Sequence, residues 1–366
     1  MKIQFNNLTL IHNQIKNQVL REINKTVDNN SYILSDQVTK FEQGFSDFTS
    51  TKYTIGCGNG TDAIELILRG LSIGPGDEVI LPVNTFIATS LAISRTGAKP
   101  VFVDNDEFYL IDVTNIERAI TNKTKAILAV NLYGQMADIK KLSKIAKNNN
   151  IYLIEDSAQS HGASQGLISQ GEFSVAASYS FYPGKNLGAW GDGGAVTTNQ
   201  KWLFEKIVSL RNQGSVKKYV HNDIGFNSRL DSIQACVLNE KLKYITSWNE
   251  ERNQVAKMYF DNLSDIKKIM LPKIFGDNYH VWHLFVIRVS SRNKLMEFLN
   301  SQGIQTGIHY PKMITNQKGY KNHMQFKNNF TKASIYENKL MSLPIFPGMK
   351  KVEVDYVSKK IKEFTG

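Results

Sequence analysis

The chain has 366 residues, 42% of them hydrophobic and 21% charged, which is long enough for about two domains and too apolar for a disordered protein. Its 44 lysine and arginine residues exceed its 33 acidic residues by 11, which predicts attraction to nucleic acid, a membrane surface or a phosphorylated small molecule. Only two cysteines occur, which excludes a disulfide framework and indicates a reducing compartment. Because the first 15 residues lack the apolar core of a signal peptide and no stretch reaches the length of a membrane span, we expect a cytoplasmic protein.

From Tyr53 to about Thr198, short apolar runs alternate with segments of helical periodicity, which is typical of an α/β fold with a parallel sheet and crossover helices. A helix is expected from Ile139 to Ala146, with four lysines on its solvated face and an asparagine cluster at 148–150 to end it. The candidate strands are Glu78 to Leu81, Pro100 to Val103, Ala126 to Leu132, Ile151 to Ile154, Val175 to Tyr179 and Ala195 to Thr198.

The C-terminal third predicts a second, smaller domain of the α+β class. A long helical pattern begins near Ser228 and continues to about Leu263, and we interpret it as the bridge between the domains. After it we expect a strand in Trp282 to Val289, a helix in Asn293 to Gln302, a strand in Ile304 to Tyr310 and a closing helix from Val352. The predicted domains are residues 1–247, with an N-terminal helical segment, and residues 248–366.

A glycine-rich segment at Gly56 to Ala63, with the sequence GCGNGTDA, leads into a helical stretch. Backbone amides at the start of a helix bind phosphate, and Asn59 can cap this helix. A capped turn without a ligand is the alternative. The segment also fits the G-x-G-x-x-A pattern of dinucleotide-binding dehydrogenases, but Leu81-Pro82-Val83-Asn84 stand where a ribose-binding acid is required about twenty residues on. The sequence therefore predicts a phosphate site but not a dinucleotide site.

A second candidate is the apolar run at 151–154 that ends in Glu155 and Asp156. A carboxylate at the carboxyl end of a sheet strand lies where α/β proteins bind ligands. If buried, it needs a cationic partner, because an isolated buried charge is costly. The alternative role for such an acid is to cap a helix.

A third candidate is Lys185, in an apolar and glycine-flanked turn with the sequence SFYPGKNLG at 180–188. A desolvated lysine loses its proton well below its free pKa of about 10.4 and becomes a nucleophile that forms Schiff bases. Taken alone, this lysine would be interpreted as a surface charge. Together with a phosphate site and a strand-end carboxylate on the same sheet, it completes the set of groups that hold pyridoxal 5'-phosphate (PLP).

Seven segments, in order over nearly the whole chain, carry a family resemblance: GCGNGTDAIEL, NTFIAT, NLYGQMAD, EDSAQSHGA, SFYPGKNLGAWGDGGAV, GFNSRLDSIQA and GIHYP. In these segments the chain resembles the DegT/DnrJ/EryC1/StrS family of nucleotide-sugar aminotransferases. The resemblance implies the fold type I architecture of aspartate aminotransferase. That architecture has a mixed, mostly parallel sheet in the large domain and a smaller α+β domain at the C-terminus.

The resemblance also implies roles for individual residues. Lys185 would bind the cofactor covalently and then move the proton between substrate and cofactor, while Asp156 would pair with the pyridinium nitrogen. A homodimer with shared active sites is implied, because one phosphate ligand would come from a neighbouring subunit. The remaining cofactor residues are Gln159 for the ring hydroxyl, Phe86 stacked on the ring, Gly60, Thr61 and Ser180 for the phosphate, and Asn227 from the neighbouring subunit.

The implied reaction takes an amino group from L-glutamate, leaves the pyridoxamine 5'-phosphate (PMP) form of the cofactor, and passes the group to a nucleotide-linked keto sugar. The FYPGKNLGA turn followed by GDGGAV is most similar to enzymes that aminate C3 of dTDP-linked 3-keto-6-deoxyhexoses. Such products enter surface polysaccharides or glycosylated natural products. Amination at C4, or of a UDP- or GDP-linked sugar, is the alternative. The implied sugar-side residues are Tyr182, Tyr219, His309 and Tyr310, each of which could instead be a packing residue.

Some residues depart from the family pattern. Asn131 replaces a common histidine, and Met313, Thr315 and Lys318 stand where relatives often have proline, histidine and proline, which bears on sugar and nucleotide specificity.

Other site types are less well supported by the sequence. His280 and His283 lack a third ligand, so we expect a structural pair and no metal site. A regulatory protein that binds the cofactor without turnover, and a basic nucleic-acid-binding protein supported by net charge alone, are the competing functions.

Overall fold

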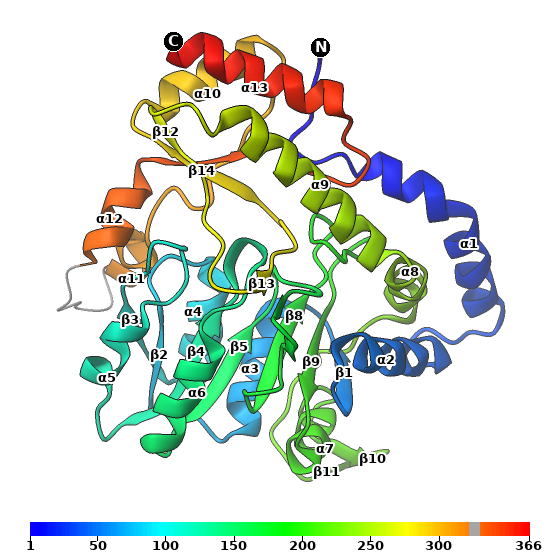
Figure 1. Cartoon of the computed structure of the whole chain (residues 1–366). Coiled ribbons are helices and arrows are strands. Elements are labelled where there is room, and N and C mark those ends of the chain that lie inside the picture. Colours follow the sequence, from blue (N-terminus) through cyan, green and yellow to red (C-terminus); the bar gives the residue numbers. More distant parts are fainter. Residues whose placement is uncertain (322–329) are drawn as a thin grey trace.

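The structure is a computed structural model that describes residues 1–321 and 330–366. Figure 1 shows a large part built around a twisted sheet, with a smaller part containing α10, α13 and β14 above it. Helix α1 (Leu8–Asp28) lies along one side, and α9 (Ile245–Leu263) runs from the sheet towards the smaller part.

Seven strands form the central sheet in the order β1-β9-β8-β5-β4-β2-β3. All neighbouring pairs are parallel except those of β9, which runs antiparallel to both β1 and β8. This mixed, mostly parallel sheet confirms the predicted α/β class. All six predicted strands are present, and β1 is the strand that the apolar patterns did not single out. The strands are β1 (Tyr53–Cys57), β2 (Glu78–Pro82), β3 (Lys99–Val103), β4 (Thr124–Val130), β5 (Tyr152–Asp156), β8 (Ala176–Ser180) and β9 (Gly194–Thr198).

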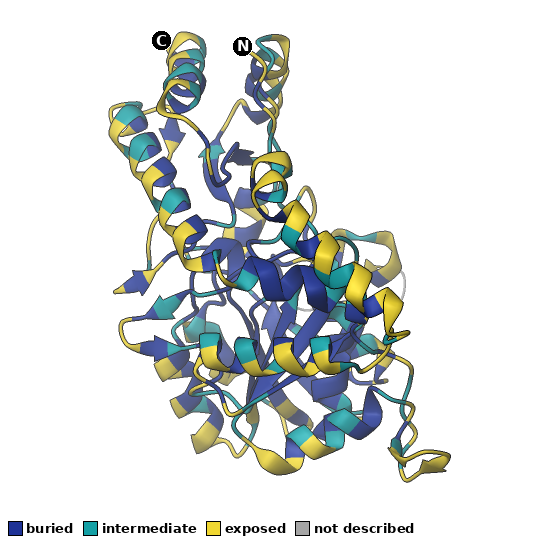
Figure 2. Cartoon of the chain, turned by 90° about the vertical axis from the view of Figure 1, so that its right-hand side faces the viewer, coloured by how far each residue is buried: buried dark blue, intermediate teal, exposed yellow. Residues whose placement is uncertain are grey.

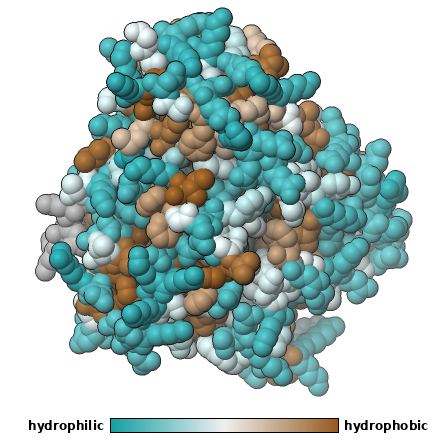
Figure 3. Space-filling model, viewed as in Figure 1, coloured by the Kyte–Doolittle hydropathy of each residue, from teal (hydrophilic) through white to brown (hydrophobic). Residues whose placement is uncertain are grey.

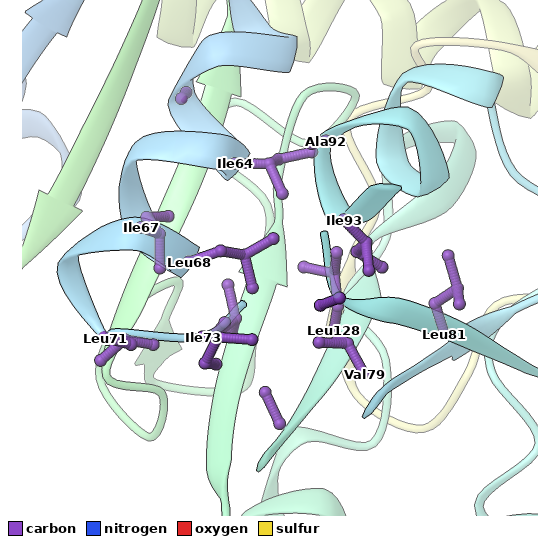
Figure 4. Packing of buried hydrophobic residues seen from close by; sticks show 14 of the residues in the cluster. Ile64, Ile67, Leu68, Leu71, Ile73, Val79, Leu81, Ala92, Ile93 and Leu128 are labelled. Atoms are coloured by element: carbon purple, nitrogen blue, oxygen red, sulfur yellow. The ribbon is translucent and has the colours of Figure 1, made fainter. Parts of the chain in front are cut away.

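Helices cover both faces of this sheet, because successive strand residues point to opposite sides. Val79 and Leu81 pack into one core cluster and Ile80 into another. Figure 4 shows the first cluster, where Leu68 and its neighbours on α3 face the sheet and α4. One face carries α3 (Gly60–Gly70), α4 (Ile87–Arg95) and α7 (Lys201–Leu210), and the other carries α2 (Asp36–Thr49), α5 (Ile116–Ala119), α6 (Ile139–Asn148) and α8 (Ser232–Leu242).

The predicted helix from Ser228 to Leu263 is wrong in one respect, because it consists of two helices, α8 and α9. Lys243 and Tyr244 separate them, and the φ of −115° at Tyr244 departs from the value of about −63° in a regular helix. Helix α8 packs against α1, where Ile15 and Val19 contact Val237. An apolar periodicity that continues across the break does not reveal a single non-helical residue.

The C-terminal part contains a three-stranded antiparallel sheet in the order β12-β14-β15, packed against helices. The predicted strand at 304–310 is wrong, because that segment forms only single bridges, from Ile304 to Ile3 and from Gly307 to Ser342. Its partners lie on different segments, so no continuous ladder forms. The elements are β12 (Ile269–Met270), β14 (Phe285–Val289), α10 (Arg292–Ser301), α11 (Lys318–Lys321), α12 (Thr331–Glu337), β15 (Leu340–Leu343) and α13 (Lys351–Thr365).

Short elements complete the fold. Among the described residues, no helix is both long and apolar enough to cross a membrane. The remaining elements are β6 (Ser164–Gln165), β7 (Ile168–Ser169) and β13 (Asn278–Tyr279) in one small sheet, the hairpin β10 (Ser215–Lys217) and β11 (Val220–His221), and the 3₁₀ turns η1 (Val113–Asn115), η2 (Leu132–Gly134) and η3 (Ile314–Asn316).

We propose that the division between the two domains lies in α9, at residues 247 and 248. Ile245 at the start of this helix packs with residues of the large sheet and α8. Further along, Val255, Tyr259 and Leu263 pack with β14, α10 and α13. One helix therefore contributes to both cores.

The exterior is mainly hydrophilic. Figure 2 shows helices with buried inner faces and exposed outer faces, and Figure 3 shows a largely hydrophilic surface with scattered hydrophobic patches. The lysines of α6 at 140, 141, 144 and 147 are exposed, as predicted for a solvated face.

We expect Leu68→Ala to lower the free energy of unfolding by about 3 kcal/mol, because Leu68 is fully buried between α3 and the sheet. Urea unfolding of the two proteins measures the difference. Leu167→Ala is the control, because Leu167 is fully exposed and its removal should change stability by less than about 0.5 kcal/mol. Equal midpoints for Leu68→Ala and wild type would contradict this account of the core.

Candidate active site

Most of the predicted functional residues gather at the carboxyl edge of the parallel strands. Strand β5 ends at Asp156 and β8 ends at Ser180, while Phe86 follows β2 directly before α4. Lys185 lies in the turn after β8. Carboxyl ends of parallel strands share one edge of a sheet, which is where α/β proteins bind ligands.

Asp156 is a buried carboxylate with neutral partners. Its Oδ2 accepts a hydrogen bond from Thr89 Oγ1 at 2.8 Å, and its Oδ1 accepts one from the Ala158 amide at 3.1 Å. Burial raises the pKa of Asp156, while these bonds and the charge of Lys185 oppose that shift. In the part of the chain that the structure describes, no ion pair includes Asp156, so its charge is available to a cationic ligand. The carboxylate does not cap a helix.

Lys185 is presented by a closed turn. The Ala189 amide donates to the Phe181 carbonyl at 2.7 Å, and the Lys185 amide donates to the Tyr182 carbonyl at 2.9 Å. Burial lowers the pKa of the Lys185 ammonium to about 8, although the charge of Asp156 opposes that shift. Near pH 7 a minority of this amine is therefore unprotonated, far more than in a free lysine, and the unprotonated form is able to act as a nucleophile.

The start of α3 and the end of β8 form a narrow cradle. Asn59 caps α3, because its Oδ1 accepts from the Asp62 amide at 2.9 Å. A Cβ at Gly60 would lie 2.5 Å from the Cβ of Ser180, so only glycine allows this approach. The free amides at Gly60 and Thr61 and the Ser180 hydroxyl thus meet at a helix N-terminus, as an anion site requires.

Gln159, Tyr310 and Phe86 lie on the same side of the site. Gln159 Nε2 donates to the Tyr310 hydroxyl at 2.9 Å, and its Oε1 accepts from the Tyr133 amide at 2.9 Å. The rings of Phe86 and Tyr310 are 5.6 Å apart, and Phe86 is 52% exposed. An exposed phenylalanine at this edge provides an open apolar face for a planar ligand.

His309 adjoins Tyr310, and its ring stacks on Phe5 with centroids 5.6 Å apart. Burial and the charge of Lys185 lower the pKa of His309 to about 4, so the ring is neutral near pH 7. Its Nδ1 lies 2.8 Å from the Ser342 hydroxyl. His309 therefore reaches the site as a neutral hydrogen-bonding group.

Two of the predicted residues lie on exposed segments of this chain. Tyr219 lies at the tip of the β10–β11 hairpin, where it is 85% exposed, and Asn227 is exposed beside the start of α3. Ser228, next to Asn227, accepts from the Gly58 amide and donates to Asp62. Tyr182 does belong to the Lys185 turn, but its side chain is 61% exposed.

Sequence reasoning missed two side chains of the site, although both lie in segments that carried the resemblance. Thr89, in NTFIAT, bonds Asp156. His161, in EDSAQSHGA, packs on the Phe181 ring, and neither of its ring nitrogens has a hydrogen-bond partner among the described groups.

Asn131, one of the departures from the family pattern, lies in a buried polar network. It is fully buried, donates to Glu155 and Ser157, and accepts from the Ala137 amide. Glu155 is its main partner and is itself buried on the opposite face of β5 from Asp156.

The two histidines of the HVWH segment contact different neighbours. His280 stacks on Trp282, with ring centroids 3.7 Å apart, and His283 lies 3.1 Å from Asn186. No group of three or more potential metal-ligating residues occurs in the described ranges.

Comparison with known proteins gives several relatives that align with almost the whole chain, and two of them are described here. A dTDP-3-amino-3,6-dideoxy-alpha-D-galactopyranose transaminase from Aneurinibacillus thermoaerophilus is 44% identical over 363 residues, which is 99% of each chain. A pleiotropic regulatory protein from Geobacillus stearothermophilus is 40% identical over 367 residues, covering 100% of this chain and 99% of the relative.

Solved structures agree. The structure of DesV from S. venezuelae in complex with a ketimine intermediate has a TM-score of 0.97 and 38% identity, covering 100% of this chain and 98% of that chain. Similar enzymes have been solved in PLP and PMP forms, which confirms the predicted cofactor. The model of the DegT/DnrJ/EryC1/StrS aminotransferase family matches residues 13–362. The chain therefore belongs to this family, and it is a PLP-dependent sugar aminotransferase.

Proposed function

We propose that the enzyme transfers the amino group of L-glutamate to the C3 keto group of a dTDP-linked 3-keto-6-deoxyhexose and forms a dTDP-3-amino-3,6-dideoxyhexose. The observation that carries the proposal is the 44% identical relative, whose name specifies a dTDP-linked 3-amino-3,6-dideoxy sugar. The net charge of +11 favours a nucleotide diphosphate over a neutral sugar.

The residues of the site fit PLP. When bound, PLP supplies an aldehyde and a pyridine ring that accepts electrons from the substrate carbon. Asp156 would hold the proton on the ring nitrogen, because its buried carboxylate has no other cation within ion-pair distance among the described residues. The Gly60 and Ser180 cradle would bind the phosphate, Gln159 the ring hydroxyl, and Phe86 one ring face.

Lys185 would perform two tasks. Its unprotonated amine would attach the cofactor, and once displaced by the amino substrate it would carry a proton to and from the substrate carbon. A pKa lowered to about 8 suits both tasks, because the amine can exist in either protonation state near neutral pH. Glutamate as donor is part of the proposal.

Sugar binding would fall to Tyr182, His309 and Tyr310. Tyr310 already contacts Gln159 and Phe86, so a sugar seated on the cofactor would lie within its reach. Exposed Tyr182 stands at the open end of the Lys185 turn.

The second candidate is amination of a UDP-linked sugar. Two relatives that are 37% identical have names that specify UDP-linked 3-keto sugars. Their names also specify C3, so the nucleotide is the point on which the two candidates differ.

The experiment that tests the function follows the visible absorbance of the cofactor-loaded enzyme after addition of glutamate and then of each keto sugar. Glutamate should bleach the lysine-bound cofactor, and dTDP-3-keto-6-deoxyglucose should restore it. Restoration by a UDP-3-keto sugar alone would select the second candidate. No bleaching by glutamate would reject the donor or point to the regulatory, non-catalytic function.

We expect Lys185→Ala to reduce turnover by about 10³-fold or more, because the substitution removes the amine that would attach the cofactor and move the proton. The variant should still bind cofactor without a covalent bond, measured by mass spectrometry after borohydride reduction. Lys141→Ala, on the exposed face of α6, is the control. Normal turnover of Lys185→Ala would reject the assignment.

We expect Asp156→Asn to lower the rate by about 10²-fold to 10³-fold, because a neutral amide does not keep the pyridine nitrogen protonated. Steady-state kinetics measures the rate, and urea unfolding checks that the fold is intact. Asp28→Asn, at the exposed end of α1, is the matched control. A near-normal rate would mean that another carboxylate serves the ring.

A homodimer with shared sites is also part of the proposal, with Asn227 and Tyr219 of each subunit at the site of the other. It is supported by exposed apolar side chains on and beside the β10–β11 hairpin, including Ile224, which is 94% exposed. Hydrophobic groups gathered in this way favour a protein partner.

We expect Ile224→Asp to raise the dissociation constant of the dimer by about tenfold to a hundredfold, because a buried isoleucine contributes about 1.5–3 kcal/mol. Light scattering after size-exclusion chromatography measures the mass across a dilution series. Leu167→Asp, equally exposed elsewhere, should not change it. If both variants keep the mass of wild type at every dilution, Ile224 is not in an interface.

A further inference from the structure

Helix α8 carries a lysine, Lys241, that is fully buried. Its Nζ donates to the carbonyl oxygen of Gly188 at 2.5 Å and lies 3.3 Å from Nε2 of His12 on α1. Across the described ranges, no carboxylate forms an ion pair with it. A buried ammonium held by a carbonyl and an imidazole is an expensive arrangement, because charge is poorly solvated in a protein interior.

Packing alone does not require this charge. Val237, one helical turn earlier on α8, faces α1 through Ile15 and Val19, and a leucine at 241 would extend the same apolar contact. Burial lowers the pKa of Lys241 to about 8, and burial together with Lys241 lowers the pKa of His12 to about 4. Near pH 7 the imidazole is therefore neutral and accepts from a lysine that is largely charged. Hydrogen bonds from a charged donor are roughly twice as strong as neutral ones.

The carbonyl that Lys241 binds belongs to the turn that presents Lys185. At Gly188 a Cβ would lie 2.4 Å from the Pro183 carbonyl oxygen, so the backbone at 188 is pressed against the other arm of the turn. On its other side the turn is fixed by Asn186, whose Nδ2 donates to Val281 O at 2.8 Å and Asn249 Oδ1 at 2.9 Å. Hydrogen bonds at Asn186 and at Gly188 therefore hold the turn that carries Lys185.

We propose that Lys241 is a positioning residue for the transamination, and that its hydrogen bond to Gly188 sets the location of the Lys185 amine. Through His12 the same ammonium ties α1 to the turn. This inference rests on the proposed role of Lys185. A displacement of about 1 Å at a reacting group is enough to change a rate by about a hundredfold. Loss of the hydrogen bond from Lys241 to Gly188 should therefore change a measurable rate.

The experiment measures how fast the apoprotein captures PLP at Lys185. Borohydride, added at successive times, reduces the C=N bond between Lys185 Nζ and the cofactor carbon to a C–N bond, and mass spectrometry counts the labelled chains. The variants are Lys241→Met, which removes the donor, and Lys241→Gln, which keeps an N–H donor. Lys243→Met, two residues away, is the matched control, because the Lys243 side chain is exposed and pairs with the buried Glu240 instead of with the Lys185 turn. Thermal unfolding is recorded for each protein.

We expect Lys241→Met to capture the cofactor about tenfold more slowly, equivalent to about 1.4 kcal/mol, while remaining folded at the assay temperature. Lys241→Gln should recover most of the rate, and Lys243→Met should match wild type. The proposal is overturned if Lys241→Met captures the cofactor at the wild-type rate, or if Lys241→Met and Lys241→Gln are equally slow.

If Lys241→Met does not fold, His12→Phe carries the test. Loss of the imidazole nitrogen should slow capture by about threefold, as expected for a partial loss of the anchor. The proposal would be overturned if His12→Phe and Lys241→Gln, tested as separate variants, both captured the cofactor at the wild-type rate. Absence of any label at Lys185 in the wild-type protein is a different result, because it would reject the role of Lys185 itself.

Discussion

The site depends on a carboxylate, Asp156, that is buried and forms no ion pair among the described residues, although the charge of Lys185 acts on it. Asp156 ends β5 in the middle of the sheet and is held by one hydroxyl and one amide. Folding leaves this charge only partly compensated, so a protonated pyridine ring would supply what the protein lacks. Binding of such a ring should therefore also stabilise the fold, because a ligand that binds only the folded state shifts the unfolding equilibrium.

The turn that carries Lys185 is held by hydrogen bonds from two different parts of the molecule. Asn186 bonds Val281 and Asn249 at the C-terminal part, and Gly188 is bonded by Lys241 of α8. Lys185 thus lies where the sheet, the α1–α8 pair and the smaller part meet.

Residues differ in how directly they can affect substrate choice, depending on whether the structure buries or exposes them. Asn131 serves a buried polar network around Glu155, and a buried network constrains packing more than substrate choice. Exposed groups such as Tyr182 and Tyr219 are free to contact a ligand or a partner. Differences in nucleotide among the relatives are therefore more readily explained at exposed loops than in the core.

Much of the fold was determined by the sequence alone. Apolar runs predicted six of the seven sheet strands, because buried parallel strands are continuous apolar segments. The motifs around Gly60, Asp156 and Lys185 predicted the cofactor, because each motif is a local chemical unit with a fixed backbone geometry.

Only the tertiary structure decided what depends on contacts between distant segments. The strand expected at 304–310 does not form, since its partners at Ile3 and Ser342 lie far away in sequence and bond it at single residues. The break at Tyr244 and the bond from Lys241 to Gly188 are likewise absent from any local pattern. Periodicity records which side of an element is buried, whereas the partner on that side is set by packing of the whole chain.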